Sequence, residues 1–438
     1  MSTRSSVTRA GAREVSPARQ PLRGTVTVPG DKSIAHRAVL FNAAARGSAT
    51  VRGLPDGADV SSTVAVMRAL GARITDRPDA VRAVRIEGTG MRFVAPPGVL
   101  DCGNSGTTMR LLVGLLAGSG LSVELDGDAS LRRRPMERVA APLRTMGADV
   151  DTTSGNAPVR IRPAVLRGAS ITLDVASAQL KSAVLLAGLS ATGRTRVCEP
   201  VPSRDHTERM LASMGVPVVR IANGAAIDGP IVPRAVDVDV CGDPSSSAFF
   251  AVAAAIVAGS DVTIEGVCLN PTRTGFVGVL RRMGAHVDVV SRGEMAGEPI
   301  GDLRVRGSRL RATKIGAAEI PSVIDELPVL AVAAACAEGT TTITGAGELR
   351  VKESDRIATV VAMLQALGVR AGERPDGMVV EGGRLIGGAS VSTDGDHRLV
   401  MSAAVAALAC ERPVGIDDAG AASVSYPGFF ATLEKLTS

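Results

Sequence analysis

Several basic and polar side chains stand where long apolar segments begin, in positions that would let them bind an anion. Helix N-termini carry unpaired N–H groups and the positive end of the helix dipole, so basic side chains gathered beside several of them favour phosphate or carboxylate. Plain capping by Ser, Asp and Asn is the alternative, but capping does not require the basic residues. The side chains in question are Lys32, Arg37, Arg110, Gln179, Lys181, His397 and Arg398.

Lysine is rare in this chain, which gives each lysine more weight. Only five of the 49 basic residues are Lys, so the other 44 are Arg. An ammonium group is a compact point charge that a planar guanidinium does not replace. We therefore expect some lysines, Lys32 at such a helix start among them, to have a specific role.

The elements that position these side chains form a repeat. The phrase Leu-x-x-Leu/Met-Gly-small-x-apolar recurs with its glycine at positions 71, 147, 215, 284 and 368, and each glycine predicts a left-handed helix C-terminus followed by a strand. Between these phrases, segments beginning at residues 30, 103, 177, 242, 324 and 395 are apolar nearly all round, which predicts buried helices. The pattern predicts six βαβαββ-type units of about 70 residues. A linear solenoid is possible, but two α/β domains of three units each bury the apolar helices better.

Composition excludes several classes of protein. Hydrophobic residues make up 45% of the 438 and charged residues 21%, which is enough for a large core. The first 23 residues carry +4 of the formal net charge of +5, so the body is nearly neutral. With eight aromatic residues in all, the chain offers little to a nucleic acid.

We also expect no membrane segment and no metal site. No apolar run reaches the ~18 residues of a membrane span, and the N-terminus lacks the apolar region of a secretory signal. The six cysteines lie far apart, without metal-ligand spacing, which favours reduced thiols in the cytoplasm.

Eight motifs, in order from about residue 20 to the C-terminus, resemble the 5-enolpyruvylshikimate-3-phosphate synthase family. Some are weak alone, but their order on a six-fold repeat is specific. They are PGDKSIAHR (29–37), GNSGTTMR (103–110), RRRPM (132–136), SAQLK (177–181), SRDHTE (203–208), IDELP (324–328), RVKESDR (350–356) and GDHR (395–398). The combination of GDKS, SAQLK, RDHTE (204–208) and NPTR (270–273) resembles the second class of these synthases.

The resemblance implies a fold of two inverse α/β domains with the active site in the cleft between them. One domain would comprise residues 21–30 and 242–438, and the other residues 31–241, with crossovers near Gly30 and Gly242. Residues 1–20, rich in Ser, Arg and Ala, are expected to form a disordered tail. The resemblance further implies a monomer that needs no cofactor.

The implied reaction transfers the enolpyruvyl group of phosphoenolpyruvate to the 5-hydroxyl of shikimate 3-phosphate, by addition and elimination, with release of phosphate. Guanidinium groups suit these anions because they bind carboxylate and phosphate in bidentate fashion. A solvated surface charge is the alternative for any single Arg. By motif position, phosphoenolpyruvate would be bound by Lys32, Asn104, Gly106, Arg134, Gln179, Arg356, His397 and Arg398. Shikimate 3-phosphate would be bound by Lys32, Ser33, Arg37, Ser177, Ala178, Gln179, Ser203, Arg204, Asp325 and Lys352.

Three residues would carry the chemistry, again by motif position. Asp325 falls where the family has its general base, and Glu353 where it has the proton donor to the methylene carbon. Lys32 would stabilise developing charge and assist the departure of phosphate. Glu326 lies beside Asp325, so one of the two acids is expected to have a raised pKa. His397 either contacts substrate or merely caps its helix.

The sequence departs from many family members near its C-terminus. Their Lys corresponds to Val424 here, and Lys181 and Arg204 are candidates to supply the missing charge. Gly106 is retained where some glyphosate-tolerant relatives have Ala, so glyphosate is expected to compete with phosphoenolpyruvate.

Two other activities would suit a related fold. A UDP-N-acetylglucosamine enolpyruvyl transferase usually carries a reactive Cys on the loop that corresponds to residues 127–136, which has no Cys here. An RNA 3'-terminal phosphate cyclase-like protein would be expected to show a basic face, which the near-neutral body lacks.

Overall fold

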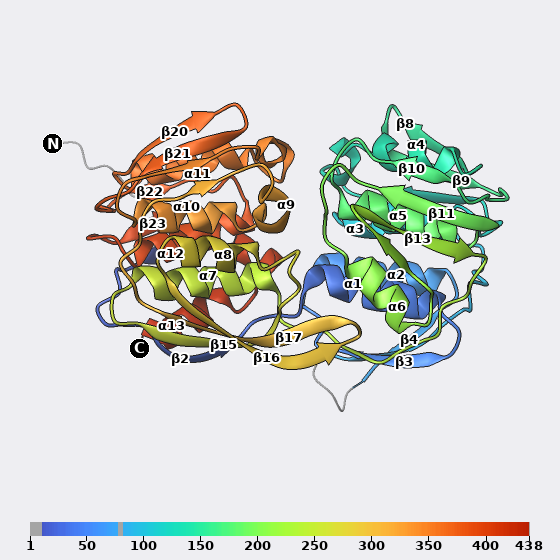
Figure 1. The fold of residues 1–438 in the computed structure, drawn as a ribbon, viewed down its shortest axis with the longest axis horizontal. Coiled ribbons are helices and arrows are strands. Elements are labelled where there is room, and N and C mark those ends of the chain that lie inside the picture. Colours follow the sequence, from blue (N-terminus) through green and yellow to red (C-terminus); the bar gives the residue numbers. More distant parts are fainter. Residues whose placement is uncertain (1–10, 78–81, 438) are drawn as a thin grey trace. The chain divides into compact units, whose positions relative to one another are not determined.

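The computed structural model describes residues 11–77 and 82–437. These fall into two compact units (Figure 1). Unit 1 comprises the chain up to Val28, Gly242–Arg292, and the chain from Gly301 onward. Unit 2 comprises Pro29–Cys241 and the short segment Gly293–Ile300.

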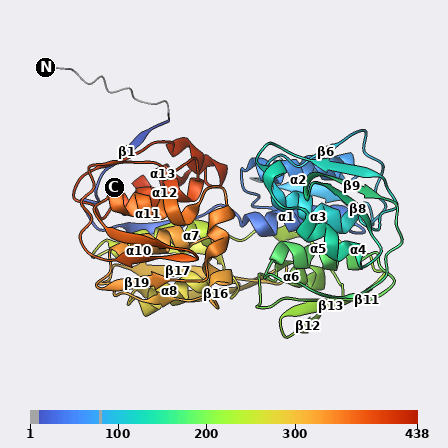
Figure 2. The same ribbon diagram turned by 90° about the horizontal axis from the view of Figure 1, so that it is seen from above.

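Unit 2 contains three repeats, each with one buried helix, one amphipathic helix and one four-stranded sheet. The buried helices are α1 (Lys32–Ala44), α3 (Gly106–Leu116) and α5 (Ala178–Gly188). The amphipathic helices are α2 (Ala58–Ala69), α4 (Glu137–Arg144) and α6 (His206–Ser213). In Figure 2, α1, α3 and α5 lie at the middle of this unit, with the strands around them.

Each sheet of unit 2 follows the same plan: a short strand pairs in parallel with the strand after the buried helix, and an antiparallel hairpin completes the sheet. The short strand precedes the buried helix in the second and third sheets, whereas in the first sheet it comes from the end of the unit. The first sheet has the order β14 (Val238–Asp239), β3 (Ser48–Arg52), β5 (Val84–Glu87), β4 (Arg73–Asp76). The second is β6 (Leu100–Asp101), β7 (Val123–Asp126), β9 (Asn156–Arg162), β8 (Asp149–Thr153). The third is β10 (Ser170–Thr172), β11 (Gly193–Cys198), β13 (Gly224–Gly229), β12 (Val219–Ile221).

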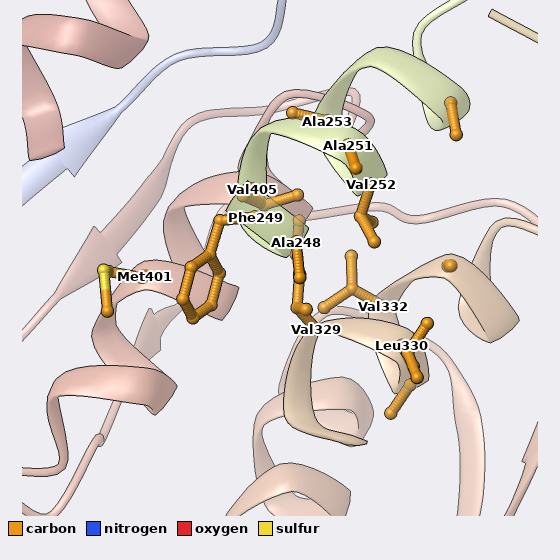
Figure 3. Close-up of a cluster of buried hydrophobic side chains, with 14 of the residues drawn as sticks. Ala248, Phe249, Ala251, Val252, Ala253, Val329, Leu330, Val332, Met401 and Val405 are labelled. Atoms are coloured by element: carbon orange, nitrogen blue, oxygen red, sulfur yellow. The ribbon is translucent and has the colours of Figure 1, made fainter. Parts of the chain in front are cut away.

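Unit 1 is likewise built around three buried helices, α7 (Pro244–Ile256), α10 (Leu327–Ala335) and α12 (His397–Ala407), and its first two sheets follow the same plan. These helices pack on one another through small and branched side chains, among them Ala248, Val252, Val332 and Val405 (Figure 3). Burial of each larger aliphatic side chain stabilises the fold by about 1.5–3 kcal/mol. The other helices of unit 1 are α8 (Gly275–Arg282), α9 (Ile320–Val323), α11 (Arg356–Ala366) and α13 (Phe429–Thr437).

Two sheets of unit 1 have four strands, and the last has three. The first is β16 (His286–Met295), β17 (Glu298–Arg306), β15 (Asp261–Cys268), β2 (Arg23–Thr27). The second is β18 (Lys314–Ile315), β19 (Thr340–Ile343), β21 (Gly377–Glu381), β20 (Arg370–Arg374). The third is β1 (Arg13–Val15), β23 (Val414–Ile416), β22 (Ser390–Val391).

The fold class predicted from the sequence is confirmed. All six apolar segments form buried helices, and the five predicted capping glycines have φ between 82° and 99°. The described helices include none with the length and apolar character that a membrane span requires.

The expected disordered tail is wrong for its second half. Strand β1 (Arg13–Val15) pairs antiparallel with β23, because the last repeat has no hairpin of its own and its sheet would otherwise end at an unpaired edge. Residues 1–10 of the expected tail lie outside the described residues.

The chain leaves unit 1 and returns to it within the β16–β17 hairpin, a crossing that the sequence did not predict. Its tip, Gly293–Ile300, belongs to unit 2. There the buried carboxylate of Glu298 lies 2.7 Å from Nδ1 of the buried His206 in α6. Arg209 of the same helix donates to the Gly297 carbonyl (3.0 Å). The tip is therefore fixed to α6 by polar contacts.

Candidate active site

In unit 2, Arg37 ties the first and third buried helices together. It is 2% exposed and donates from Nε to Thr207 Oγ1 (2.7 Å) and from Nη2 to Ser182 Oγ (2.9 Å). Its Nη1 donates to the Ser33 carbonyl (2.9 Å). Burial lowers the pKa of Arg37 to about 10, partly offset by the negative charge of Glu208. Arg37 thus remains cationic at neutral pH and holds the start of α1 against α5 and α6.

The starts of α3 and α5 are joined in the same way. Arg110 donates from Nη1 to Gln179 Oε1 (2.6 Å), and Gln179 Nε2 donates to Thr107 Oγ1 (2.8 Å). The three buried helices of unit 2 therefore begin side by side, as an anion-binding site requires.

Arg134 adds a second guanidinium beside the start of α3. It directly follows the short helix η1 (Leu131–Arg133), and its Nη2 donates to Asn104 Oδ1 (2.6 Å). Gly106 is the first residue of α3, and a Cβ placed there would lie 3.0 Å from Arg110 Nη1 and 3.3 Å from Arg134 Nη1. A side chain at this position would therefore press on both cationic groups.

Lys32 is the first residue of α1, and its side chain is 42% exposed. It forms an ion pair with Asp59 of α2. Nothing in the spacing of the sequence pointed to this partner, because Asp59 belongs to the amphipathic helix. The pairing holds the ammonium group near the N-terminus of α1.

Capping and anion binding use different residues at these helix starts. The side chains of Asp31, Ser105 and Ser177 accept the capping hydrogen bonds of α1, α3 and α5, and Asp396 caps α12. His397 is therefore not the cap of its helix. The basic residues at these helix starts are therefore not needed as caps.

Glu199 is a buried acid that the sequence analysis missed. Its carboxylate accepts hydrogen bonds from the Ser177 backbone N–H (2.7 Å) and from the Ser203 hydroxyl (2.7 and 2.8 Å). Lys181 lies between Glu199 and Glu208, with 2.9 Å from Nζ to each carboxylate. Lys181 is 3% exposed, and two carboxylates within unit 2 already compensate its charge. Arg204, the other candidate, is half-buried.

In unit 1, Arg356 is the centre of a cluster of carboxylates. It opens α11 and is 1% exposed. Its Nε donates to Asp396 Oδ2 (2.7 Å) and its Nη2 to Glu353 Oε2 (2.7 Å), while Nη1 lies 3.6 Å from Asp325 Oδ1. Three predicted site residues, Asp325, Glu353 and Arg356, are therefore brought together in this unit.

Asp325 lies in the connection between α9 and α10, one residue before the N-cap of α10. Arg398 of α12 donates from Nη1 to the Asp325 carbonyl (3.0 Å), and its Nη2 lies 4.0 Å from Asp325 Oδ2. The neighbouring Glu326 is buried and accepts a hydrogen bond from Ser245 instead. The two adjacent acids thus have different surroundings, and Asp325 is the one that lies among the arginines.

The charges of this cluster decide the protonation of Glu353 and His397. Desolvation would raise the pKa of Glu353, but a backbone hydrogen bond and the positive charges around it, that of Arg356 first, together outweigh it and lower the pKa to about 2. Burial, followed by the charge of Arg398, lowers the pKa of His397 to about 4. At neutral pH Glu353 is therefore a carboxylate and His397 a neutral imidazole.

The remaining residues that the sequence singled out lie in differing surroundings. Lys352 precedes Glu353 and is exposed. Val424 ends the short helix η3 (Ala419–Val424) and is 54% exposed. Arg273 of the NPTR motif is buried and paired with Asp243 (2.9 Å), the cap of α7. Among the described residues, no group of three His, Cys, Asp or Glu side chains could hold a metal ion.

The cluster around Arg356 gives a prediction about stability. Replacing Arg356 with Met leaves the buried Asp396 without its cation, which we expect to lower the free energy of unfolding by about 3–5 kcal/mol at neutral pH. In the native chain, burial would raise the pKa of Asp396, but the charge and the hydrogen bond of Arg356 chiefly offset this effect, and the pKa is lowered. The ionised Asp396 therefore stabilises the fold above the unfolded pKa of 3.8. This stabilisation is lost as the pH falls through the folded pKa. In the variant its folded pKa lies above the unfolded one, so the deficit shrinks as the pH is lowered.

Urea unfolding at about pH 7 and about pH 5 measures this difference. Arg350→Met is the control, because Arg350 is 29% exposed and pairs with the surface acids Asp355 and Glu373. The Arg350→Met variant should lose less than about 1 kcal/mol of the free energy of unfolding at both pH values. An Arg356→Met deficit that is the same at both pH values would contradict the prediction.

The fold and the two sets of residues place the chain among the enolpyruvyl transferases. The solved structure of the enolpyruvyl transferase NikO from Streptomyces tendae matches it in fold, with a TM-score of 0.79, 21% identity, and coverage of 97% of this chain and 96% of that one. The EPSP synthase from Acinetobacter baumannii has a TM-score of 0.89 and 41% identity, with coverage of 97% and 98%.

The chain belongs to the EPSP synthase (3-phosphoshikimate 1-carboxyvinyltransferase) family, whose model matches residues 17–433. A 3-phosphoshikimate 1-carboxyvinyltransferase from Synechococcus sp. is 50% identical, over 95% of this chain and 97% of the relative. One from Alkalilimnicola ehrlichii is 51% identical, over 93% and 92%. The chain is therefore an enzyme of this kind, and the sugar-nucleotide transferase and cyclase alternatives are not favoured.

Proposed function

We propose that this chain transfers the enolpyruvyl group of phosphoenolpyruvate to the 5-hydroxyl of shikimate 3-phosphate. The observation that carries the proposal is the cluster in unit 1, where Asp325 and Glu353 lie around Arg356. Such an arrangement combines two groups that exchange protons with a cation that binds an anion. Unit 2 supplies Lys32 and the joined helix starts.

In the addition step, the oxygen of the 5-hydroxyl bonds to C2 of phosphoenolpyruvate, and the Asp325 carboxylate takes the proton of that hydroxyl. Glu353 gives a proton to C3, so that the methylene becomes a methyl group. In the elimination step, the C2–O bond to phosphate breaks, the Glu353 carboxylate takes back a proton from the methyl group, and the enol double bond forms again. The departing phosphate takes the proton that Asp325 had accepted, so both acids return to their starting states. Lys32 stabilises the departing phosphate.

Glu353 must carry a proton in order to donate one, although it is ionised in the free chain. The positive charge around Arg356 lowers its pKa. Phosphoenolpyruvate is an anion, and its binding to Arg356 and Arg398 would offset that charge and raise the pKa of Glu353. The side chain is 41% exposed, so solvent can supply the proton.

Substrate choice is the direct test of this proposal. Phosphate release from phosphoenolpyruvate is measured with shikimate 3-phosphate and, separately, with UDP-N-acetylglucosamine as acceptor. We expect release only with shikimate 3-phosphate. Activity confined to the sugar nucleotide would overturn the proposal.

Gly106→Ala should separate an inhibitor from the substrate. We propose that glyphosate competes with phosphoenolpyruvate here, and the added methyl group would press on Arg110 and Arg134. A longer ligand tolerates this less than a shorter one, so the ratio of the glyphosate inhibition constant to the phosphoenolpyruvate KM should rise about ten-fold or more. The two constants are measured in both proteins, and an unchanged ratio would remove Gly106 from the phosphoenolpyruvate site.

We further propose a cytoplasmic monomer that binds no nucleic acid. The six cysteines are all free, as in a reducing compartment. Light scattering during gel filtration tests the monomer, and a mass that is a multiple of the 44.7 kDa chain would contradict it.

A further inference from the structure

Two of the residues proposed to bind shikimate 3-phosphate share one buried partner. Ser177 is the N-cap of α5, and Ser203 lies 26 positions later in the chain, before α6. Both donate to the carboxylate of Glu199, whose side chain is fully buried. The Ser203 backbone N–H also points to this carboxylate (3.3 Å). One acid therefore fixes the separation of two segments that are distant in sequence.

The charge of Glu199 is compensated within the same cluster. Lys181 lies 2.9 Å from Glu199 and 2.9 Å from Glu208, and it donates to the Ser203 carbonyl (3.4 Å). Desolvation would lower the pKa of Lys181, but the two carboxylates outweigh it and raise the pKa. Lys181 is therefore charged, and its charge offsets the cost of burying a carboxylate behind an anion site.

We infer that Glu199 is a positioning residue for the phosphate group of the acceptor substrate, an inference that rests on the proposed function. It aligns Ser177 and Ser203 so that both can turn to one phosphate, without touching the substrate itself. The Ser203 hydroxyl rotates from Glu199 to the phosphate on binding, while Ser177 N–H and Lys181 keep the carboxylate in place. Glu199 thereby favours acceptors that carry a phosphate group.

Glu208 provides a matched control for Glu199. Both are buried acids at the same distance from Lys181, and Glu208 has no hydrogen bond to Ser177 or Ser203 among those of the described residues. Glu199→Gln and Glu208→Gln remove the same charge from the same lysine. Only the first disturbs the two serines.

The experiment measures kcat and both KM values for the two variants, and binding of shikimate 3-phosphate and of unphosphorylated shikimate. We expect Glu199→Gln to raise the KM for shikimate 3-phosphate about ten- to a hundred-fold, with the phosphoenolpyruvate KM little changed. Its preference for shikimate 3-phosphate over shikimate should fall by a similar factor. Glu208→Gln should keep the native preference.

The outcomes are distinguishable. Equal effects of the two variants would overturn the inference. A lower KM for shikimate 3-phosphate in Glu199→Gln would also overturn it, because repulsion between Glu199 and the phosphate would then outweigh the alignment of the serines. If Glu199→Gln does not fold, Glu199→Asp is used instead. It keeps a negative charge beside Lys181, but its shorter side chain does not reach the two serines, so we expect the same loss of phosphate preference. Failure of the native chain to use shikimate 3-phosphate would instead contradict the proposed function.

Discussion

Asp325→Ala should lower kcat by about 10²–10⁴-fold, because it removes the group that takes the proton of the attacking hydroxyl. Asp325 lies 3.6 Å from Arg356 and 4.0 Å from Arg398, and neither arginine depends on it alone. Arg356 keeps Asp396 and Glu353, and Arg398 donates to the Asp325 backbone, which the substitution retains. We therefore expect shikimate 3-phosphate to bind with nearly native affinity.

Binding by calorimetry and turnover by phosphate release separate these two effects. Glu319→Ala is a suitable control, because Glu319 is an acid on the same stretch of chain whose partner is Arg282, outside the cluster. Its turnover should be native. If Asp325→Ala loses substrate affinity in parallel with rate, Asp325 is a binding residue and not the base.

Lys32→Arg should reduce kcat by about 10²-fold or more although it keeps the charge. The ammonium group of Lys32 is a point charge paired with Asp59 at the start of α1. A guanidinium is wider, spreads its charge over a plane, and would make its own bidentate pair with Asp59. The charge would then be withdrawn from the departing phosphate.

Lys314→Arg is the matched control, because Lys314 is an exposed lysine on β18 and carries no proposed role. It should leave kcat and both KM values unchanged. Near-native turnover of Lys32→Arg would show that this position needs only a positive charge, and the special role that we assign to the rare lysines would not hold.

The sequence predicted those parts of the molecule that repeat. A helix whose side chains are apolar on every face must be buried, and the glycines that end the amphipathic helices need a left-handed conformation. Both features are local, so periodicity reveals them. The motifs likewise predicted that Asp325, Glu353 and Arg356 belong to one site. In the structure, both carboxylates lie beside the guanidinium of Arg356.

The parts that sequence did not predict depend on contacts between distant segments. Strand β1 is ordered because the last sheet lacks a hairpin, which its own composition does not reveal. Asp59 and Glu199 are isolated acids without a motif, and only folding brings them to Lys32 and Lys181. The signal available for Glu199 was weak: a lysine inside a buried helix, at position 181, requires a counter-charge.

The hairpin tip at Gly293–Ile300 has a consequence for anyone who wishes to divide this enzyme. A gene fragment that encodes only residues 29–241 would carry the contiguous part of unit 2 but not Glu298, which is the partner of the buried His206. Arg209 would also lose its acceptor at Gly297. The eight residues 293–300, encoded far downstream, are thus needed to complete the unit. A split or circularly permuted enzyme should therefore keep this hairpin joined to α6 by a designed linker.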